Sequence, residues 1–158
     1  MRIVPASLAL IGCGVSLYLG LYQYGAIAHI WEPFFGGGSA TVLHAGVLEP
    51  LSRALGFPIH DAILGSLAYG VEMVFALLQN REGGVRAKLF TTAYCVVVIG
   101  MGLTSIVLVI LQGTVFHAWC TLCLVSAAIS EAIVLVSYRE FEKLITLWPI
   151  VTRMPESK

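Results

Sequence analysis

The stretch WCTLCLVSAAISEAIVLV, residues 119–136, decides the fold because it is an apolar run of the length that a membrane-spanning helix needs. Cys120 and Cys123 stand at its start. Residues three apart in a helix share one face, which brings the two sulfur atoms near the separation of a disulfide. The unpaired N–H groups and positive dipole end of a first helical turn stabilise a thiolate. The stretch therefore predicts a spanning helix with a dithiol suited to redox exchange at one membrane surface.

Composition places the whole chain in the membrane class. Of its 158 residues, 58% are hydrophobic and 11% are charged, and the mean hydropathy is +0.90, whereas soluble domains are about 45–50% apolar and about 25% charged. The short connection over residues 112–117 makes the last two spans an antiparallel hairpin. We predict an all-α integral membrane protein, a single four-transmembrane-helix bundle over residues 1–158. The spans are expected at residues 3–22, 62–78, 89–111 and 119–136.

Lys and Arg indicate the orientation. Three basic residues lie within residues 81–88 and four follow the fourth span, whereas residues 23–61 contain one and residues 112–117 contain none. The positive-inside rule then places both termini, including a tail over residues 138–158, in the cytoplasm. Cys120 faces the other side, a compartment that permits disulfides. We expect a multi-pass protein of a bacterial inner (plasma) membrane.

The N-terminus offers a second interpretation. Residues 10–13, LIGC, resemble a bacterial lipoprotein cleavage box, which would make Cys13 a lipidated terminus. A secretory signal turns polar after a short apolar region, but this run stays apolar through Leu21. We therefore expect an uncleaved first span with Cys13 as a small buried residue. The helical rise places Cys13 and Cys95 too deep to exchange with Cys120.

Residues 23–61 are expected to cover the outer ends of the spans. Glycines 36–38 allow a close backbone approach, and Ser39 is of a type that caps helices. Apolar residues recur at helical spacing over residues 42–55, with an interruption at Pro50. We predict one or two short amphipathic helices on the outer face; the alternative is a loosely packed surface loop.

Several motifs form a set that covers most of the chain. They are AWCTLCL at residues 118–124 with Ser126 and Ala127, SATVL at 39–43, GFPI at 56–59, and Gly65, Tyr69 and Gly70. With the order of four spans, they resemble the vitamin K epoxide reductase family, whose bacterial members are similar in role to the periplasmic quinone-linked disulfide bond formation protein. The resemblance implies an oxidoreductase that takes electrons from a thioredoxin-like extracytoplasmic thiol protein. The oxidoreductase passes these electrons to a quinone of the ubiquinone, menaquinone or vitamin K type. Its other expected partner is membrane lipid, and no nucleic-acid partner is expected.

The resemblance also implies roles for single residues. Cys120 is the outer cysteine, which exchanges with the substrate thiol through a mixed disulfide, and Cys123, one turn deeper, contacts the quinone ring. The simpler alternative for both is burial in an apolar helix. Asp61 stands where the family places a polar side chain that hydrogen-bonds a quinone oxygen, although it is equally of a type that caps helices.

One departure from the family pattern concerns the outer segment. The family usually carries two cysteines there, which relay electrons from the partner to the membrane dithiol. Residues 23–61 contain no cysteine, and Ser39 stands where the second is expected. Serine cannot form a disulfide, so this relay is missing. We favour direct exchange of an outside thiol with Cys120; the alternatives are an engineered, blocking replacement at Ser39 and an activity that has drifted.

Histidine and tryptophan near the dithiol have two interpretations each. His117 would stabilise a thiolate or move a proton to the quinone, or is an interfacial histidine. Trp119 is a wall of the quinone site or, more simply, part of the aromatic belt. His29, His44 and His60 also lie in the outer segment, but their spacing has no metal-ligand pattern.

Glu72 and Glu131 fall near mid-bilayer and closer to the cytoplasm, by the rise per residue. Ionisable groups at such depths are costly and often functional. We expect them either to be protonated and hydrogen-bonded between helices, the simpler alternative, or to belong to a proton route. Residues 139–148 are predicted to form a cytoplasmic interfacial helix.

Two other function classes remain open at this point. One is a soft-metal-binding membrane protein in which Cys120, Cys123 and His117 hold an ion such as Cu(I) or Hg(II). Metal transport would call for further sulfur ligands along the pore. The other class is a non-catalytic membrane subunit.

Overall fold

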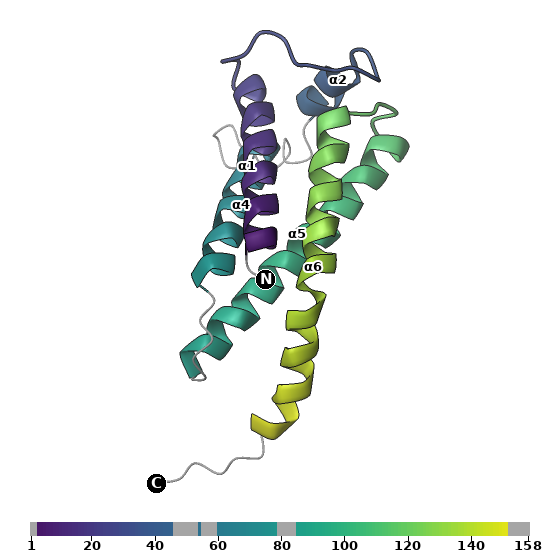
Figure 1. Ribbon diagram of the computed structural model, residues 1–158. Coiled ribbons are helices and arrows are strands. Elements are labelled where there is room, and N and C mark those ends of the chain that lie inside the picture. The colour runs from purple at the N-terminus through teal and green to yellow at the C-terminus, as the bar shows by residue number, and fades with distance from the viewer. Residues whose placement is uncertain (1–2, 46–53, 55–59, 79–84, 152–158) are drawn as a thin grey trace.

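The computed structural model describes residues 3–45, 54, 60–78 and 85–151. Figure 1 shows four long helices in a bundle, with a short helix at one end. The long helices are α1 (Ile3–Gln23), α4 (Asp61–Leu78), α5 (Val85–Thr114) and α6 (Thr121–Val151), and the short one is α2 (Gly38–Ala45). Each long helix contains a stretch that is long and apolar enough to cross a membrane. The prediction of an all-α bundle with four spans is confirmed, and its treatment as a single domain stays a prediction.

Small residues let α1 and α4 pack closely. The buried face of α1 carries Ala9, Gly12, Ser16 and Gly20, whose spacing of three or four residues defines one helix face. A Cβ atom on Gly12 would lie 2.6 Å from the Tyr69 ring, so only glycine fits there. Small residues at such interfaces allow the close backbone approach by which helices associate in lipid.

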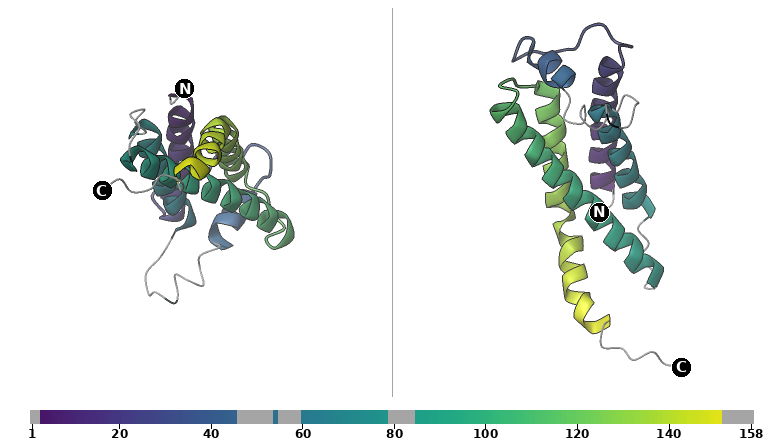
Figure 2. Two further views of the ribbon diagram at one scale, coloured as in Figure 1. Left: turned by 90° about the horizontal axis from the view of Figure 1, so that it is seen from below. Right: turned by 180° about the vertical axis from the view of Figure 1, so that it is seen from behind.

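Helix α5 crosses the bundle obliquely. Figures 1 and 2 show it starting beside the end of α4 and finishing beside the start of α6. The connection to α6 covers residues 115–120, where His117 has a left-handed backbone with φ of 47°. This short turn makes α5 and α6 an antiparallel hairpin, as the sequence predicts.

Helix α6 is longer than expected. Its apolar stretch ends at Tyr138, yet the helix continues to Val151 and extends past the other helices at the end opposite α2 (Figure 1). Residues 139–148 are therefore helical, as predicted, but they continue α6; their place at the membrane interface stays a prediction. No glycine or proline interrupts those residues, so nothing in the local sequence ends the helix.

Two apolar clusters fill the bundle. The larger surrounds Tyr69 and Ile133, and the smaller joins Leu19, Leu43 and Cys120 at the end where α2 lies. Large apolar side chains also face outward on all four long helices, as suits contact with lipid. Helix α2 is one of the short helices predicted for the outer segment. The second would fall on residues 47–55, which lie outside the described residues except for residue 54.

Candidate functional site

The start of α6 positions the two cysteines. The Cys120 carbonyl accepts a hydrogen bond from the Leu124 N–H at 3.0 Å, so Cys120 occupies the cap position immediately before the helix. Its Sγ atom accepts the Cys123 N–H at 3.1 Å. A helix leaves its first N–H groups without internal partners, and a side-chain acceptor at the cap satisfies one of them. The dithiol therefore belongs to the helix terminus itself, with only Cys123 inside the first turn.

Cys120 and Cys123 form a disulfide, with their Cα atoms 5.2 Å apart. This separation lies within the usual range for disulfides. The two cysteines differ in solvent exposure, because Cys120 is completely buried while Cys123 is partly buried. Helix α2 covers Cys120: Leu43 belongs to the same apolar cluster, and a Cβ on Gly38 would overlap the Trp119 carbonyl oxygen.

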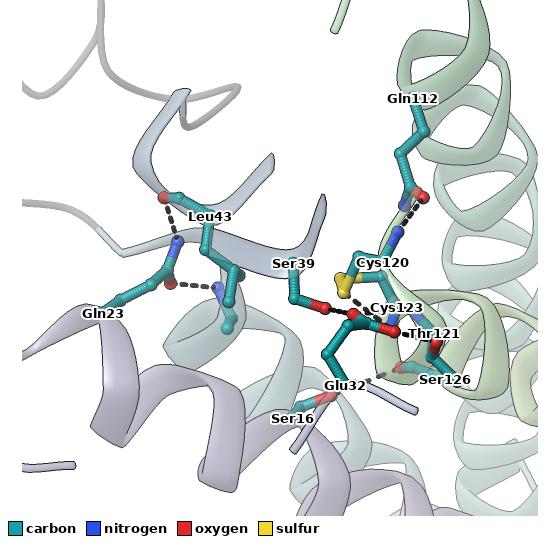
Figure 3. Close-up of a disulfide and its surroundings, with 11 residues drawn as sticks. Ser16, Gln23, Glu32, Ser39, Leu43, Gln112, Cys120, Thr121, Cys123 and Ser126 are labelled. Atoms are coloured by element: carbon teal, nitrogen blue, oxygen red, sulfur yellow. Dashed lines mark hydrogen bonds between the residues drawn. A yellow bond between two sulfur atoms is a disulfide. The ribbon is translucent and has the colours of Figure 1, made fainter. Parts of the chain in front are cut away.

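Glu32 links the covering segment to the start of α6. Figure 3 shows its carboxylate between Ser39 of α2 and Thr121 of α6. One oxygen accepts the Ser39 hydroxyl and, at 3.3 Å, the Thr121 N–H, and the other accepts the Thr121 hydroxyl. Glu32 was not among the site residues predicted from the sequence. The available signal was that Glu32 is the only carboxylate within residues 23–45.

Two glutamines complete the polar framework. Gln112, which is buried near the end of α5, accepts the Cys120 N–H through Oε1 at 3.2 Å. Gln23, at the end of α1, accepts the Ala62 N–H at 3.2 Å and donates to the Leu43 carbonyl at 3.0 Å. Gln23 thereby joins three helices, α1, α2 and α4. Both glutamines satisfy backbone groups that the helix ends leave unpaired.

A cavity of about 140 Å³ lies beside Cys123. Its wall is mainly apolar, and its polar groups include Gln23, Asp61, Tyr69 and Gln112. An apolar cavity of about 150 Å³ is known to accept benzene, so this one has the size of a single aromatic ring. Cys123 lines the cavity and Cys120 does not, which gives the two sulfurs different surroundings.

Hydroxyl groups form a network on the deeper wall of the cavity. The Tyr69 hydroxyl donates to the Ser126 carbonyl at 2.7 Å and lies 2.7 Å from the Ser130 Oγ. The Ser126 Oγ lies 3.1 Å from the same tyrosine oxygen and 3.4 Å from the Ser16 Oγ. This network fixes α1, α4 and α6 against one another where Cys123 faces the cavity.

Asp61 and Ser39 are two further site residues that were predicted from the sequence. Asp61 lines the cavity and is the first residue of α4. The cap position before it belongs to His60, whose carbonyl accepts the Ile63 and Leu64 N–H groups. Ser39 does not cap α2, since that helix begins at Gly38.

His117 and Trp119 do not line the cavity described here. His117 is exposed, and the Trp119 ring packs against Gly113, where a Cβ would lie 3.2 Å away. The rings of His44 and His60 instead face tyrosines, with centroids 6.0 Å from Tyr22 and 6.2 Å from Tyr24 respectively. Among the described residues, no group of three or more His, Cys, Asp or Glu side chains is arranged to hold a metal ion.

The two membrane carboxylates lie within the bundle. Glu72 on α4 is almost fully buried, and Glu131 on α6 is partly buried beside Gly102. One oxygen of each, Glu72 Oε2 and Glu131 Oε1, has no hydrogen-bond partner within the part of the chain that the structure describes.

A comparison with protein families decides the assignment. The model of the vitamin K epoxide reductase family matches residues 3–138. The chain belongs to the vitamin K epoxide reductase family. Membership indicates a multi-pass membrane protein with disulfide oxidoreductase activity, and a cysteine pair is present at the start of α6. No curated protein and no solved structure gives a significant match.

Proposed function

We propose that this protein of the vitamin K epoxide reductase family carries electrons from extracytoplasmic thiols through Cys120 and Cys123 to a quinone, and so supports disulfide formation. The observation that carries the proposal is the position of the disulfide. It joins a sulfur under the outer segment to a sulfur on the wall of a ring-sized apolar cavity. A pair so placed is suited to exchange between a water-borne thiol and a lipid-borne acceptor.

Cys120 and Cys123 are sufficient to carry the two electrons of the reaction from thiols to a quinone. A substrate thiolate attacks the Cys120 sulfur, the Cys120–Cys123 bond breaks, and Cys123 leaves as a thiolate. A second substrate thiolate attacks the mixed disulfide, which releases the substrate disulfide and leaves the protein pair reduced. A quinone accepts the two electrons and two protons that the pair then gives up. Two thiols and one quinone become one disulfide and one quinol.

The residues of the cavity fit a quinone. An apolar wall suits its ring, and Asp61, Gln23 and Gln112 supply polar atoms at the end near α2. Ligand sites of this kind combine a largely apolar lining with a few placed polar groups. We assign Asp61 to hydrogen bonding with a quinone oxygen, and place His117 and Trp119 at the membrane surface outside the cavity.

The thiol donor is proposed to be a thioredoxin-like protein that acts directly on Cys120, because residues 23–61 contain no relay cysteine. The distribution of basic residues supports an orientation with both termini in the cytoplasm of a bacterial cell. The Cys120 end then faces a compartment in which disulfides persist.

Thiol titration tests this function against its alternatives. The purified protein is reduced, freed of reductant without oxygen, and its thiols are counted before and after addition of a short-chain ubiquinone or menaquinone analogue. We expect the loss of two thiols from wild type and of none from a Cys123→Ala variant. A metal carrier or a non-catalytic subunit would keep its thiols in the presence of quinone, and that result would contradict the proposal.

A further inference from the structure

We propose that Glu32 is a positioning residue that holds the outer segment closed over Cys120 and keeps the cysteine pair in its oxidised state. The inference deepens the proposed thiol–quinone exchange and rests on it for its biological meaning. Its physical basis is separate, because it concerns only the surroundings of the disulfide.

The Glu32 carboxylate contacts both the outer segment and the start of α6. Glu32 accepts hydrogen bonds from Ser39 on α2 and from both the N–H and the hydroxyl of Thr121 on α6. Hydrogen bonds to an ionised acceptor are roughly twice as strong as neutral ones. One carboxylate therefore joins the outer segment to the residue that follows Cys120 (Figure 3).

The outer segment limits access to the Cys120 sulfur. Cys120 and Ser39 are both 0% exposed, and an attacking thiolate must reach the Cys120 sulfur. The segment that carries Ser39 has to move before a protein thiol can do so. That movement breaks the hydrogen bond between Ser39 and Glu32. The bridge that Glu32 forms between Ser39 and Thr121 therefore controls how often Cys120 becomes accessible.

The charge of Glu32 acts on the balance between the disulfide and the reduced cysteines. The positive end of the α6 dipole and its free N–H groups stabilise one nearby anion, whether that is a carboxylate or a thiolate. In the disulfide neither sulfur is charged, and Glu32 is the carboxylate that accepts the Thr121 N–H at this end of the helix. Reduction creates a thiolate beside the carboxylate, and the two like charges repel. Glu32 thereby favours the disulfide over the reduced pair.

The family resemblance places the second relay cysteine at position 39, where a covalent bond to the membrane dithiol would pass through the same gap. In this chain Ser39, Glu32 and Thr121 occupy it with hydrogen bonds. The bridge holds the segment without carrying electrons, so the thiol must come from outside.

The test compares variants that separate charge from contact. Equilibration of the purified protein with dithiothreitol buffers gives the reduction equilibrium of the Cys120–Cys123 disulfide. The initial rate of its reduction by 2-mercaptoethanol measures how accessible the Cys120 sulfur is. For Glu32→Gln we expect an equilibrium about five- to tenfold further toward the reduced pair, equal to about 20–30 mV, and faster reduction. Ser39→Ala should speed reduction while leaving the equilibrium within about twofold of wild type. Glu32→Asp keeps the charge and should keep the equilibrium, and Glu142→Gln on the far part of α6 is the charge control.

An unchanged equilibrium and rate in Glu32→Gln would overturn the inference. An equal shift of the equilibrium in Glu32→Gln and Ser39→Ala would also overturn it, because loosening of the segment would then explain both. Circular dichroism verifies that each variant keeps its helices. Failure of quinone to reoxidise wild type would instead contradict the proposed function and leave these dithiothreitol results standing.

Discussion

The carboxylate at the outer end of the bundle and the carboxylate in its interior have opposite surroundings. Glu32 accepts three hydrogen bonds beside the disulfide, whereas Glu72 is almost fully buried with Oε2 lacking a partner among the described residues. Buried polar groups without partners are costly, and charged groups in a membrane more so. The difference teaches that the outer end is arranged to hold a charge next to the cysteine pair, while the interior holds a carboxyl group with one oxygen that no described residue supports.

The largest effect is expected at the cysteines. Cys120→Ala and Cys123→Ala should each lower thiol-dependent quinone reduction by more than about 100-fold, because the covalent step is lost. Cys123→Ala should also trap a mixed disulfide between Cys120 and the thiol donor, visible by non-reducing electrophoresis. Cys13→Ala is the control and should keep its activity. A mixed disulfide that forms at Cys123 in Cys120→Ala instead would reverse the assigned roles of the two sulfurs.

The next largest effect probes the gap at the outer end. Ser39→Cys in a Cys123→Ala background should place a thiol that bonds to Cys120, since Ser39 and Thr121 share one Glu32 oxygen. Oxidation should lower the intact mass by about 2 Da, the two hydrogens lost on forming a disulfide. Ser137→Cys, beside Tyr94, is the matched control and should give no bond to Cys120. Absence of the bond from the Ser39 variant would show that α2 does not cover Cys120.

An intermediate effect concerns the close contact of α1 and α4. Gly12→Ala should lower stability by about 1–3 kcal/mol, because the added methyl group overlaps the Tyr69 ring and forces it to shift. Gly14→Ala is a matched control on the same helix, with nothing within 4 Å of its Cβ, and should be neutral or stabilising by up to about 1 kcal/mol. Thermal unfolding in detergent measures both. Equal losses in the two variants would contradict the packing of this face.

The smallest effect is expected in the interior. Glu72→Gln keeps the shape of the side chain and should change stability by less than about 1 kcal/mol, with no change in the dithiothreitol equilibrium. The physical reason is that Glu72 lies on α4 between Tyr69 and Ala76, which belong to the larger apolar cluster, whereas Cys120 belongs to the smaller cluster at the end where α2 lies. A shift as large as that of Glu32→Gln would remove the contrast and favour a proton route through Glu72.

Features that depend on local pattern could be predicted from the sequence. Hydrophobic length predicted the four spans, the short connection predicted the α5–α6 hairpin, and the spacing of Cys120 and Cys123 predicted that the two sulfurs could form a disulfide at a helix start. The helix at residues 139–148 was predicted, but its continuity with α6 was not, because a change in composition marks the end of a membrane span and does not end the helix.

Features that depend on long-range contact could not be predicted. Glu32, Ser39 and Thr121 meet only because the loop after α1 folds back over α6, and Glu32 is 89 residues from Thr121. The same holds for the cavity, whose wall draws on four long helices and α2. Asp61 shows how far local pattern can be used. Its place at the start of α4 followed from the sequence, but the exact cap residue depended on backbone geometry that residue propensity does not specify.

Quinol formation in reconstituted vesicles tests the central claim most directly. Wild-type protein is placed in lipid with a menaquinone or ubiquinone analogue, a membrane-impermeant thiol such as glutathione is added without oxygen, and quinol is followed by absorbance. The account predicts one quinol for each glutathione disulfide formed, and no quinol above background with Cys120→Ala. Equal quinol formation by wild type and Cys120→Ala would contradict it.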